Sequence, residues 1–413
     1  MKKLLFTLLL YITIIVTSFA NDLTVLDLIK NTPQLDLTDI YVFQSITPGK
    51  TVFILDYNPQ SHKDSLNNSS SQGIYRICIG ANEHFTKGIA PTFTFKDNKI
   101  QLYIANTAEP KNSDKGIFIG EGQVNKQLVF KNGIKIWAGT VYNLFIGNTP
   151  GIANFREKAN QGIYDLSTFD ITEKSNTFSL APSSVIVLEI PNEMLPKQLY
   201  YYAITATKIN GKWITVNKVA QVLFSHLYTF NDEQAIQYFN SNHHFDKNLE
   251  KMVYETILKY VKVAGLQKRP EAYTKKVVKQ IYPDVLTYEV GTDAEYSMQN
   301  INGRPLHADA INVALALLVG SEVPIDDNVG INLDMFQDKF PYVVPIDSSY
   351  SNSSVDVIKV TTNDINLNFN ETNWNSLDEG VGNSSHLSVT TWTILGVIFL
   401  LIVIGFITRK KNN

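Results

Sequence analysis

Short apolar runs separated by turn residues dominate the chain up to about residue 230. Residues 52–55, 92–95, 100–104 and 117–119 are rich in Val, Ile, Phe and Tyr, and polar or glycine residues interrupt the sequence between them. Runs of β-branched and aromatic residues, bounded by turn formers, are typical of β-strands. We therefore expect most of this part of the chain to form β-strands.

Two of the connections carry a specific turn signal. Asn132-Gly133 and Asn210-Gly211 each separate two apolar runs. Asn and Gly tolerate the positive φ angles of a type I′ turn, whose twist matches that of two paired strands. Each of these dipeptides therefore predicts a β-hairpin.

The pattern changes in the next part of the chain. From 248 to 265 the apolar residues recur with helical spacing, with Asp246 as an N-cap and Gly265 as a stop signal. Residues 308–319 are rich in Ala and Leu and predict a second helix or a buried strand. We expect a mainly β fold of two sandwich-like β modules with a helical section near residues 246–320, which is α+β overall.

An apolar segment stands near each end of the sequence. Lys2 and Lys3 precede an apolar run with small residues at its exit, residues 18–20, which is typical of a cleavable secretory signal. Residues 387–408 carry no charge and are long enough to cross a bilayer as a helix. Basic residues 409–411 follow at once and place that end in the cytosol. We expect a single-pass type I membrane protein.

The expected parts of the chain follow from these changes in pattern. A weak duplication, residues 39–43 against 165–169, favours two β modules, and chance similarity of β-rich sequence explains it equally well. A stretch rich in Asn, Ser, Thr and Asp without apolar periodicity is typical of an extended stalk. The parts are a signal peptide (1–20), a first β module (21–148), a second β module with the helical section (149–345), a stalk (346–386), a transmembrane helix (387–408) and a cytosolic tail (409–413).

The charge balance bears on the partners of the exported part. The chain has 36 basic and 39 acidic residues, and five of the basic residues lie in the two ends. The exported part then has 31 basic against 39 acidic residues, a net charge of −8, so no nucleic-acid partner is expected. The single cysteine, Cys78, lies in an apolar strand-like run and is expected to be a buried, inert thiol.

Several phrases, taken together, resemble one known family. In order and spacing they resemble motifs of domain-of-unknown-function family 4331: residues 36–43, 56–59, 184–191, 283–288 and 302–306, then Asn332, Phe336 and residues 340–342. The resemblance covers about residues 33–345 and implies an extracytoplasmic, β-rich fold with no established reaction. The chain departs from the family pattern at 80–84 and 155–165, where acidic residues are missing, so any cation-binding role of those acids in relatives is not expected here.

Four carboxylates are the candidates for a cation site. Asp36 and Asp39 lie three residues apart before a strand, and Asp326 and Asp327 belong to an oxygen-rich stretch that extends to Asp334. Ca²⁺ is the cofactor that these residues suggest, although it takes six to eight oxygen ligands and the spacing is not that of an EF-hand. The alternatives are turn capping by Asp39 and a solvated loop at the second pair.

Two other constellations have a structural alternative that we favour. His243 and His244 with Asp246 are zinc-ligand types, but adjacent residues of a strand point to opposite faces, and a polar loop before the helix explains them. Arg304, near Asp309, offers a planar fork for a carboxylate ligand. An internal ion pair of Arg304 that fixes the neighbouring turn is the alternative.

No nucleophile-elbow, metalloprotease or phosphate-loop motif occurs in the sequence. We therefore expect a luminal or extracellular β-rich domain that binds a protein or glycan ligand, rather than an enzyme. A third hypothesis is a structural module stabilised by a cation. The main alternative is an exported hydrolase or carbohydrate-active enzyme with two or more of these carboxylates in one cleft: Asp36, Asp39, Asp309, Asp326 and Asp327.

Processing signals accompany the expected export. Lys410 and Lys411 stand fourth and third from the C-terminus, which resembles the dilysine signal that returns type I membrane proteins to the endoplasmic reticulum through coat-protein binding. The alternative is a plain positive-inside anchor, so the expected location is the membrane of the cell surface or of the endoplasmic reticulum. Five sequons predict glycosylation in a eukaryotic secretory pathway, and the first two overlap: Asn67, Asn68, Asn352, Asn370 and Asn383.

Overall fold

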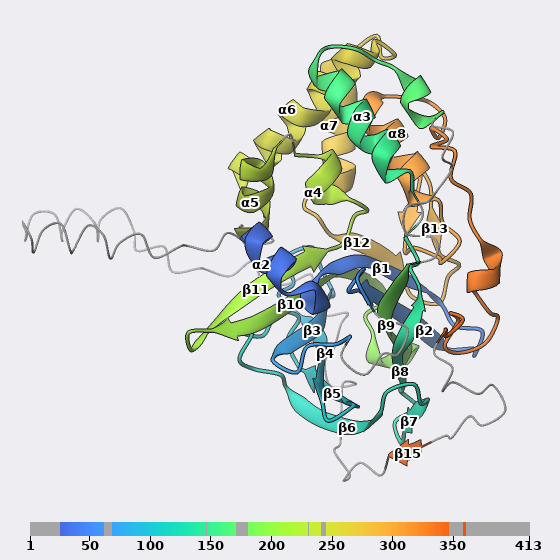
Figure 1. Ribbon diagram of the computed structural model, residues 1–413. Helices are drawn as coiled ribbons and strands as arrows, with labels where there is room; N and C mark the ends of the chain where they lie inside the picture. Colours follow the sequence, from blue (N-terminus) through green and yellow to red (C-terminus); the bar gives the residue numbers. More distant parts are fainter. Residues whose placement is uncertain are drawn as a thin grey trace, which may run out of the picture. The chain divides into compact units, whose positions relative to one another are not determined.

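Two large sheets and a helical section make up the described part of the chain. The computed structural model describes residues 25–61, 68–145, 147–170, 181–229, 231–240, 245–346 and 358–360. All of these residues belong to one compact unit. The sheets stack as a sandwich and most of the helices gather at one end of it (Figure 1). The expected mainly β, α+β class with a helical section is confirmed.

The first sheet, sheet A, is antiparallel except at one edge, where β15 runs parallel to β7. β15 lies within the stretch for which the sequence predicted a stalk without regular structure. The strands of sheet A in spatial order are β1 (Leu37–Gln44), β2 (Lys50–Tyr57), β9 (Pro182–Pro191), β8 (Lys135–Tyr142), β7 (Leu128–Phe130) and β15 (Ile358–Val360).

The second sheet, sheet B, is antiparallel throughout, and a short strand, β12 (Leu286–Glu289), pairs with β10 beside its main path. A separate two-stranded ribbon consists of β13 (Glu295–Tyr296) and β14 (Ile301–Asn302). The strands of sheet B in spatial order are β11 (Lys212–Val219), β10 (Gln198–Ile209), β3 (Gly73–Gly80), β4 (Gly88–Lys96), β5 (Lys99–Ala105) and β6 (Ile117–Gln123).

Among the described residues, one α-helix precedes β1, one lies between β8 and β9, and the others lie between β11 and β12 or between β14 and β15. The α-helices are α2 (Val25–Asn31), α3 (Thr149–Asn160), α4 (Phe224–Leu227), α5 (Asp232–Asn240), α6 (Lys247–Ala264), α7 (Pro270–Ile281) and α8 (Ala310–Val319). The 3-10 helices are η1 (Pro33–Leu35), η2 (Leu166–Phe169), η3 (Asn192–Met194) and η4 (Leu333–Met335).

Both predicted hairpins and both predicted helices are confirmed. Asn132-Gly133 joins β7 to β8, and Asn210-Gly211 joins β10 to β11. Asp246 caps α6, because its side chain accepts hydrogen bonds from the first turn of the helix. α8 occupies most of the second predicted helix. Local signals therefore placed these elements correctly.

Strands from the two expected β modules are mixed in both sheets. β9 follows residue 148 in sequence but lies between β2 and β8, which precede it, and β10 pairs with β3. Each sheet thus needs strands from both stretches to complete its hydrogen bonding, and the expected boundary at residues 148 and 149 does not separate two sandwiches. The weak duplication is also not reflected, because one copy is β1 and the other is η2.

The main core lies between the facing sides of the two sheets. The ring of Phe53 on β2 meets Tyr201 on β10 with centroids 6.2 Å apart, and Tyr57 meets Tyr75 on β3 at 4.7 Å. Cys78 on β3 is buried, as expected, and burial raises the pKa of its thiol to about 12. The thiol is therefore protonated at neutral pH.

The outer face of sheet A is covered by residues 335–346, which we call the C-terminal strap. Val185 and Trp137 of the sheet pack in one cluster with Tyr342 and Val343 of the strap. The backbone N–H of Ile346 donates to Thr140 O on β8 at 3.1 Å. The strap therefore covers the outer face of sheet A around Trp137 and Val185.

Glu189 fastens the strap to the sheet. This buried carboxylate on β9 forms ion pairs with Lys135 at 2.8 Å and Lys50 at 3.3 Å. It accepts hydrogen bonds from Ser45 at 2.8 Å and from the hydroxyl of Tyr342 at 3.0 Å. Burial acts to raise the pKa of Glu189, but these donors outweigh it and lower the pKa.

Candidate functional site

The first pair of candidate carboxylates lies at the start of β1, where each side chain has its own protein partner. Asp36 accepts a hydrogen bond from Asn217 Nδ2 at 2.7 Å, and burial raises its pKa to about 7. Asp39 forms a buried ion pair with Arg304. Burial raises the pKa of Asp39, and the guanidinium offsets part of that shift. Asp36 and Asp39 are therefore engaged separately and do not share a ligand.

Arg304 makes an internal ion pair, which is the alternative favoured for it, and its partner is Asp39 on β1 rather than Asp309. Its guanidinium lies over the ring of Tyr41 at 4.4 Å, and its backbone N–H donates to Val42 O at 2.8 Å. Burial opposes its charge, but Asp39 raises the pKa of Arg304 above its usual value. The pair joins β1 to the segment before α8, and the Arg304 side chain is only 3% exposed, so its guanidinium does not face solvent.

The second pair of candidate carboxylates lies beside Asp309, near the starts of α3 and α8. Asp327 is buried and accepts hydrogen bonds from two backbone N–H groups at 2.7 and 3.0 Å. Asp309 caps α8, and burial together with the charges of Asp327 and Asp326 raises its pKa to about 6. Three of the five carboxylates of the hydrolase hypothesis therefore lie near one another, while the first pair lies elsewhere.

Cation ligation finds no support in the described side chains. Within the described ranges, no group of three or more His, Cys, Asp or Glu side chains is placed to hold a metal ion. Asp246 is the N-cap of α6, and its oxygen accepts from Asn248 N at 2.8 Å. His243 and His244 lie outside the described residues. The Ca²⁺ site remains a prediction.

The processing signals fall mainly outside the described residues. The exception is Asn68, which is 4% exposed and donates from Nδ2 to Thr140 Oγ1 at 3.1 Å. Because Nδ2 is the atom that carries an N-linked glycan, this position disfavours Asn68, and glycosylation of the overlapping pair stays a prediction. The other predicted positions outside the described residues are Asn67, Asn352, Asn370, Asn383, Lys410 and Lys411.

The two apolar segments, residues 1–20 and 387–408, also lie outside the described residues. Among the helices that the structure does describe, none combines the length and the apolar character needed to cross a membrane.

A buried lysine of sheet B lies beneath α5. Burial lowers the pKa of Lys218 on β11 to about 8, and its ammonium lies 3.8 Å from the ring centroid of Tyr238. The Tyr238 hydroxyl donates to Asp284, whose pKa burial raises to about 6. Lys218 is only 7% exposed, so this cluster docks α5 on the sheet and offers no open reaction site.

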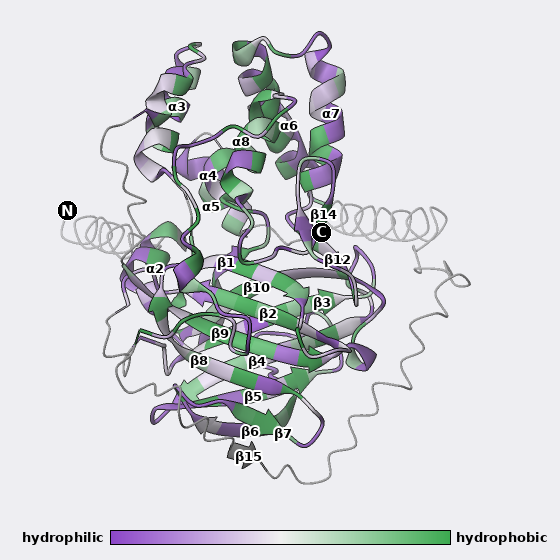
Figure 2. Ribbon diagram, turned by 90° about the vertical axis from the view of Figure 1, so that its right-hand side faces the viewer, coloured by the Kyte–Doolittle hydropathy of each residue, from purple (hydrophilic) through white to green (hydrophobic). Residues whose placement is uncertain are grey.

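α7 has two faces of opposite character. Val277 and Ile281 are buried against the rest of the helical section. Lys275, Lys276 and Lys279 are exposed on the other side, where Lys279 lies about one helical turn from each of the other two, at i, i+4 and i, i+3. Among the described residues, these three lysines have no ion-pair or hydrogen-bond partner. Figure 2 shows this alternation of hydrophilic and hydrophobic residues along α7.

On the neighbouring helix α6, two exposed lysines have carboxylate partners. Lys251 lies 3.7 Å from Glu255, and Lys262 lies 2.8 Å from Glu271 of α7. Pairs of this kind neutralise each other at the surface. Lys251 and Lys262 thus have carboxylate partners, whereas the three exposed lysines of α7 have none among the described residues.

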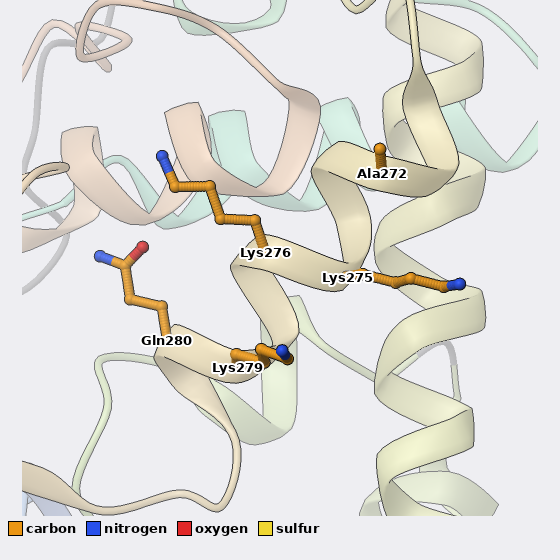
Figure 3. A pocket seen from close by; sticks show the side chains of 5 residues that line it. All are labelled: Ala272, Lys275, Lys276, Lys279 and Gln280. Atoms are coloured by element: carbon orange, nitrogen blue, oxygen red, sulfur yellow. The ribbon is translucent and has the colours of Figure 1, made fainter.

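A shallow, open hollow of about 510 Å³ lies on this face of α7 (Figure 3). Lys276 and Gln280 extend to one side of it, and Lys275 extends to the other. Gln280 is held in place, because its Nε2 donates to Met298 O at 3.2 Å. The ammonium groups diverge, so the face presents a strip of positive charge rather than an enclosed pocket. The lining residues are Ala272, Lys275, Lys276, Lys279 and Gln280.

The sequence predictions missed α7 and therefore missed its basic face. The signal was present: Pro270 occupies the first turn, and Tyr273, Val277 and Ile281 recur with helical spacing. In a helix over these residues, the three lysines lie on the side opposite to these apolar residues.

Comparison with known proteins adds no further assignment. The sequence matches no family model. It also has no significant match among curated proteins or among solved structures. The resemblance to domain-of-unknown-function family 4331 therefore stays a prediction.

Proposed function

We propose that the chain is a single-pass membrane-anchored binding protein whose exported domain binds an anionic partner through the exposed face of α7. The observation that carries the proposal is the set of three lysines, Lys275, Lys276 and Lys279, which are exposed together without a carboxylate partner among the described residues. Ammonium groups concentrated on one face create a local positive potential that attracts and orients negatively charged partners.

The surroundings of this face support a specific contact. The exported part carries a net charge of −8, whereas residues 268–279 contain five basic residues and one acidic residue. An acidic partner would be repelled by most of the domain and attracted to α7. The partner would therefore approach in one orientation, which is the usual consequence of charge complementarity.

The anchoring part of the proposal rests on the sequence. The uncharged segment 387–408 followed by basic residues, together with the signal-like residues 1–20, supports export and a type I anchor in the cell surface or the endoplasmic reticulum. The exposed face of α7 would then meet partners on the luminal or extracellular side.

Retention of the full-length chain on a heparin column, in detergent, tests the role of α7. The variant Lys275→Gln, Lys276→Gln, Lys279→Gln should elute at lower salt than the wild type, because ionic contacts weaken as screening increases. The matched control replaces three exposed lysines elsewhere by Gln: Lys96, Lys208 and Lys212. The proposal fails if the α7 variant and the control elute together.

A further inference from the structure

Several helices meet at the side of the helical section that faces away from the sheets. α3 and α6 end there and α7 begins there (Figures 1 and 2). Lys259 Nζ on α6 donates to Asn160 Oδ1 on α3 at 3.0 Å, and Gln267 Nε2 donates to Gly320 O, after α8, at 2.6 Å. The first contact places the end of α3 beside α6, and the second joins the loops 265–269 and 320–323. We call the loops at this end of the helical section the helical tip: residues 160–163, 265–269 and 320–323.

Each loop of the helical tip exposes one aliphatic side chain. Ile163 and Leu266 are each 48% exposed, and Val323 is 66% exposed. Single exposed aliphatic residues are common on protein surfaces, but Leu266 and Val323 stand on two loops that contact each other through Gln267 and Gly320. Because these side chains stand on separate loops, they do not form one continuous ridge that would fill a groove of a protein partner. A fluid apolar layer, such as the acyl-chain region of a bilayer, can accommodate them individually.

Basic side chains adjoin these aliphatic residues. Lys268 and Arg269 are exposed at the helical tip and lie directly before α7, whose lysine strip continues from them. Glu271, the acidic residue of this turn, is already paired with Lys262 at 2.8 Å. Glu322 is the one acidic residue within the three loops of the helical tip. The surface therefore combines exposed aliphatic groups with an excess of positive charge.

We propose that the helical tip docks on an anionic lipid surface. Leu266 and Val323 enter the boundary between headgroups and acyl chains, while Lys268, Arg269 and the lysines of α7 contact the phosphate and carboxylate groups of the lipids. Peripheral binding of this kind combines buried apolar area with attraction to anionic headgroups, and the helical tip supplies both. The inference rests on the proposed function, because it names the anionic partner of the α7 face.

A fluorescent label at the helical tip tests insertion directly. Cys78 is the single cysteine of the chain and is buried, so Leu266→Cys gives one accessible thiol for an environment-sensitive NBD label. The full-length chain is held in nanodiscs of neutral phosphatidylcholine and mixed with separate vesicles. With vesicles that contain phosphatidylserine, the NBD emission should rise by about twofold or more, because the label leaves water for the lipid boundary. A label at Lys208→Cys, on the β10–β11 hairpin, should not respond.

Changes in vesicle composition and two charge variants test whether the rise in NBD emission depends on electrostatic attraction. The rise should disappear with pure phosphatidylcholine vesicles and with added salt, because the attraction is electrostatic. Lys268→Gln with Arg269→Gln should reduce it, whereas the equal charge loss of Lys208→Gln with Lys212→Gln should not. An unchanged emission with phosphatidylserine vesicles, or an equal rise with both lipids, overturns the proposal.

The heparin experiment separates this inference from the proposed function. If the α7 variant loses heparin retention but the label at residue 266 never responds to lipid, α7 binds an anionic partner that is not a bilayer, and only the lipid inference fails. If neither the retention nor the label depends on the basic residues, both proposals fail.

Discussion

Asp56 is a buried carboxyl whose pKa is strongly raised in the folded state. It lies on the outer face of sheet A beside the Asp39–Arg304 pair and accepts a hydrogen bond from Leu144 N at 3.0 Å. Burial, and then the charge of Asp39, raise its pKa from 3.8 to about 8. The guanidinium of Arg304 already neutralises the carboxylate of Asp39. A negative charge on Asp56 would therefore have no positive partner of its own.

The raised pKa of Asp56 predicts a specific pH dependence of stability. Because its pKa is higher in the folded than in the unfolded state, its contribution is fully present below about pH 4 and is lost as the pH rises through about 8. The urea-derived free energy of unfolding should therefore fall by at least about 1 kcal/mol between about pH 5 and about pH 9. Asp56→Asn should lessen this fall, since Asn keeps an acceptor for Leu144 N. Asp338→Asn, at an exposed carboxylate, should retain the wild-type dependence.

The C-terminal strap shows how one element depends on a few buried polar contacts. Tyr342 has a φ of +70°, a left-handed conformation that is unfavourable for a side chain with a Cβ. Its hydroxyl offsets that cost through Ser45 at 2.8 Å and Glu189 at 3.0 Å. We expect Tyr342→Phe to lower the free energy of unfolding by about 1–3 kcal/mol, because buried partners are left unsatisfied. Limited proteolysis should then cut the strap faster than in the wild type.

A second tyrosine provides the comparison for that variant. The hydroxyl of Tyr103, on the outer side of sheet B, makes one long hydrogen bond to Gln101 at 3.3 Å. Tyr103→Phe should therefore cost much less than Tyr342→Phe. Equal stability and equal strap proteolysis of the two variants would show that Tyr342 does not fasten the strap.

Elements with a local signal could be predicted from the sequence, and contacts between distant residues could not. The hairpins at Asn132-Gly133 and Asn210-Gly211 are encoded by the dihedral preferences of two neighbouring residues. The Asp39–Arg304 pair, by contrast, joins residues 265 positions apart, and Arg304 alone does not reveal which carboxylate it meets. The burial of Asn68 likewise depends on β8, which is distant in sequence.

The same limit applies to the whole molecule and to the candidate site. Alternating apolar runs predicted strands, but not that β9 would enter between β2 and β8, because pairing partners are chosen by the completed sheet. Net charge predicted an acidic exported part and gave no sign of the basic strip, since an average over the chain hides a local excess. The site became visible only when α7 placed its lysines on one face.

The mixed order of strands predicts that the first expected module does not fold alone. Residues 21–148 lack β9, so β2 and β8 lose their shared neighbour, and they lack β10 and β11, so β3 becomes an open edge. Trp137 is the only tryptophan of that fragment and is fully buried in the structure. Its emission in residues 21–148 should be that of a solvent-exposed indole, with no cooperative urea transition. Residues 21–346 should show buried emission and cooperative unfolding. Cooperative unfolding of the short fragment with a buried Trp137 would contradict the interleaved arrangement of the two sheets.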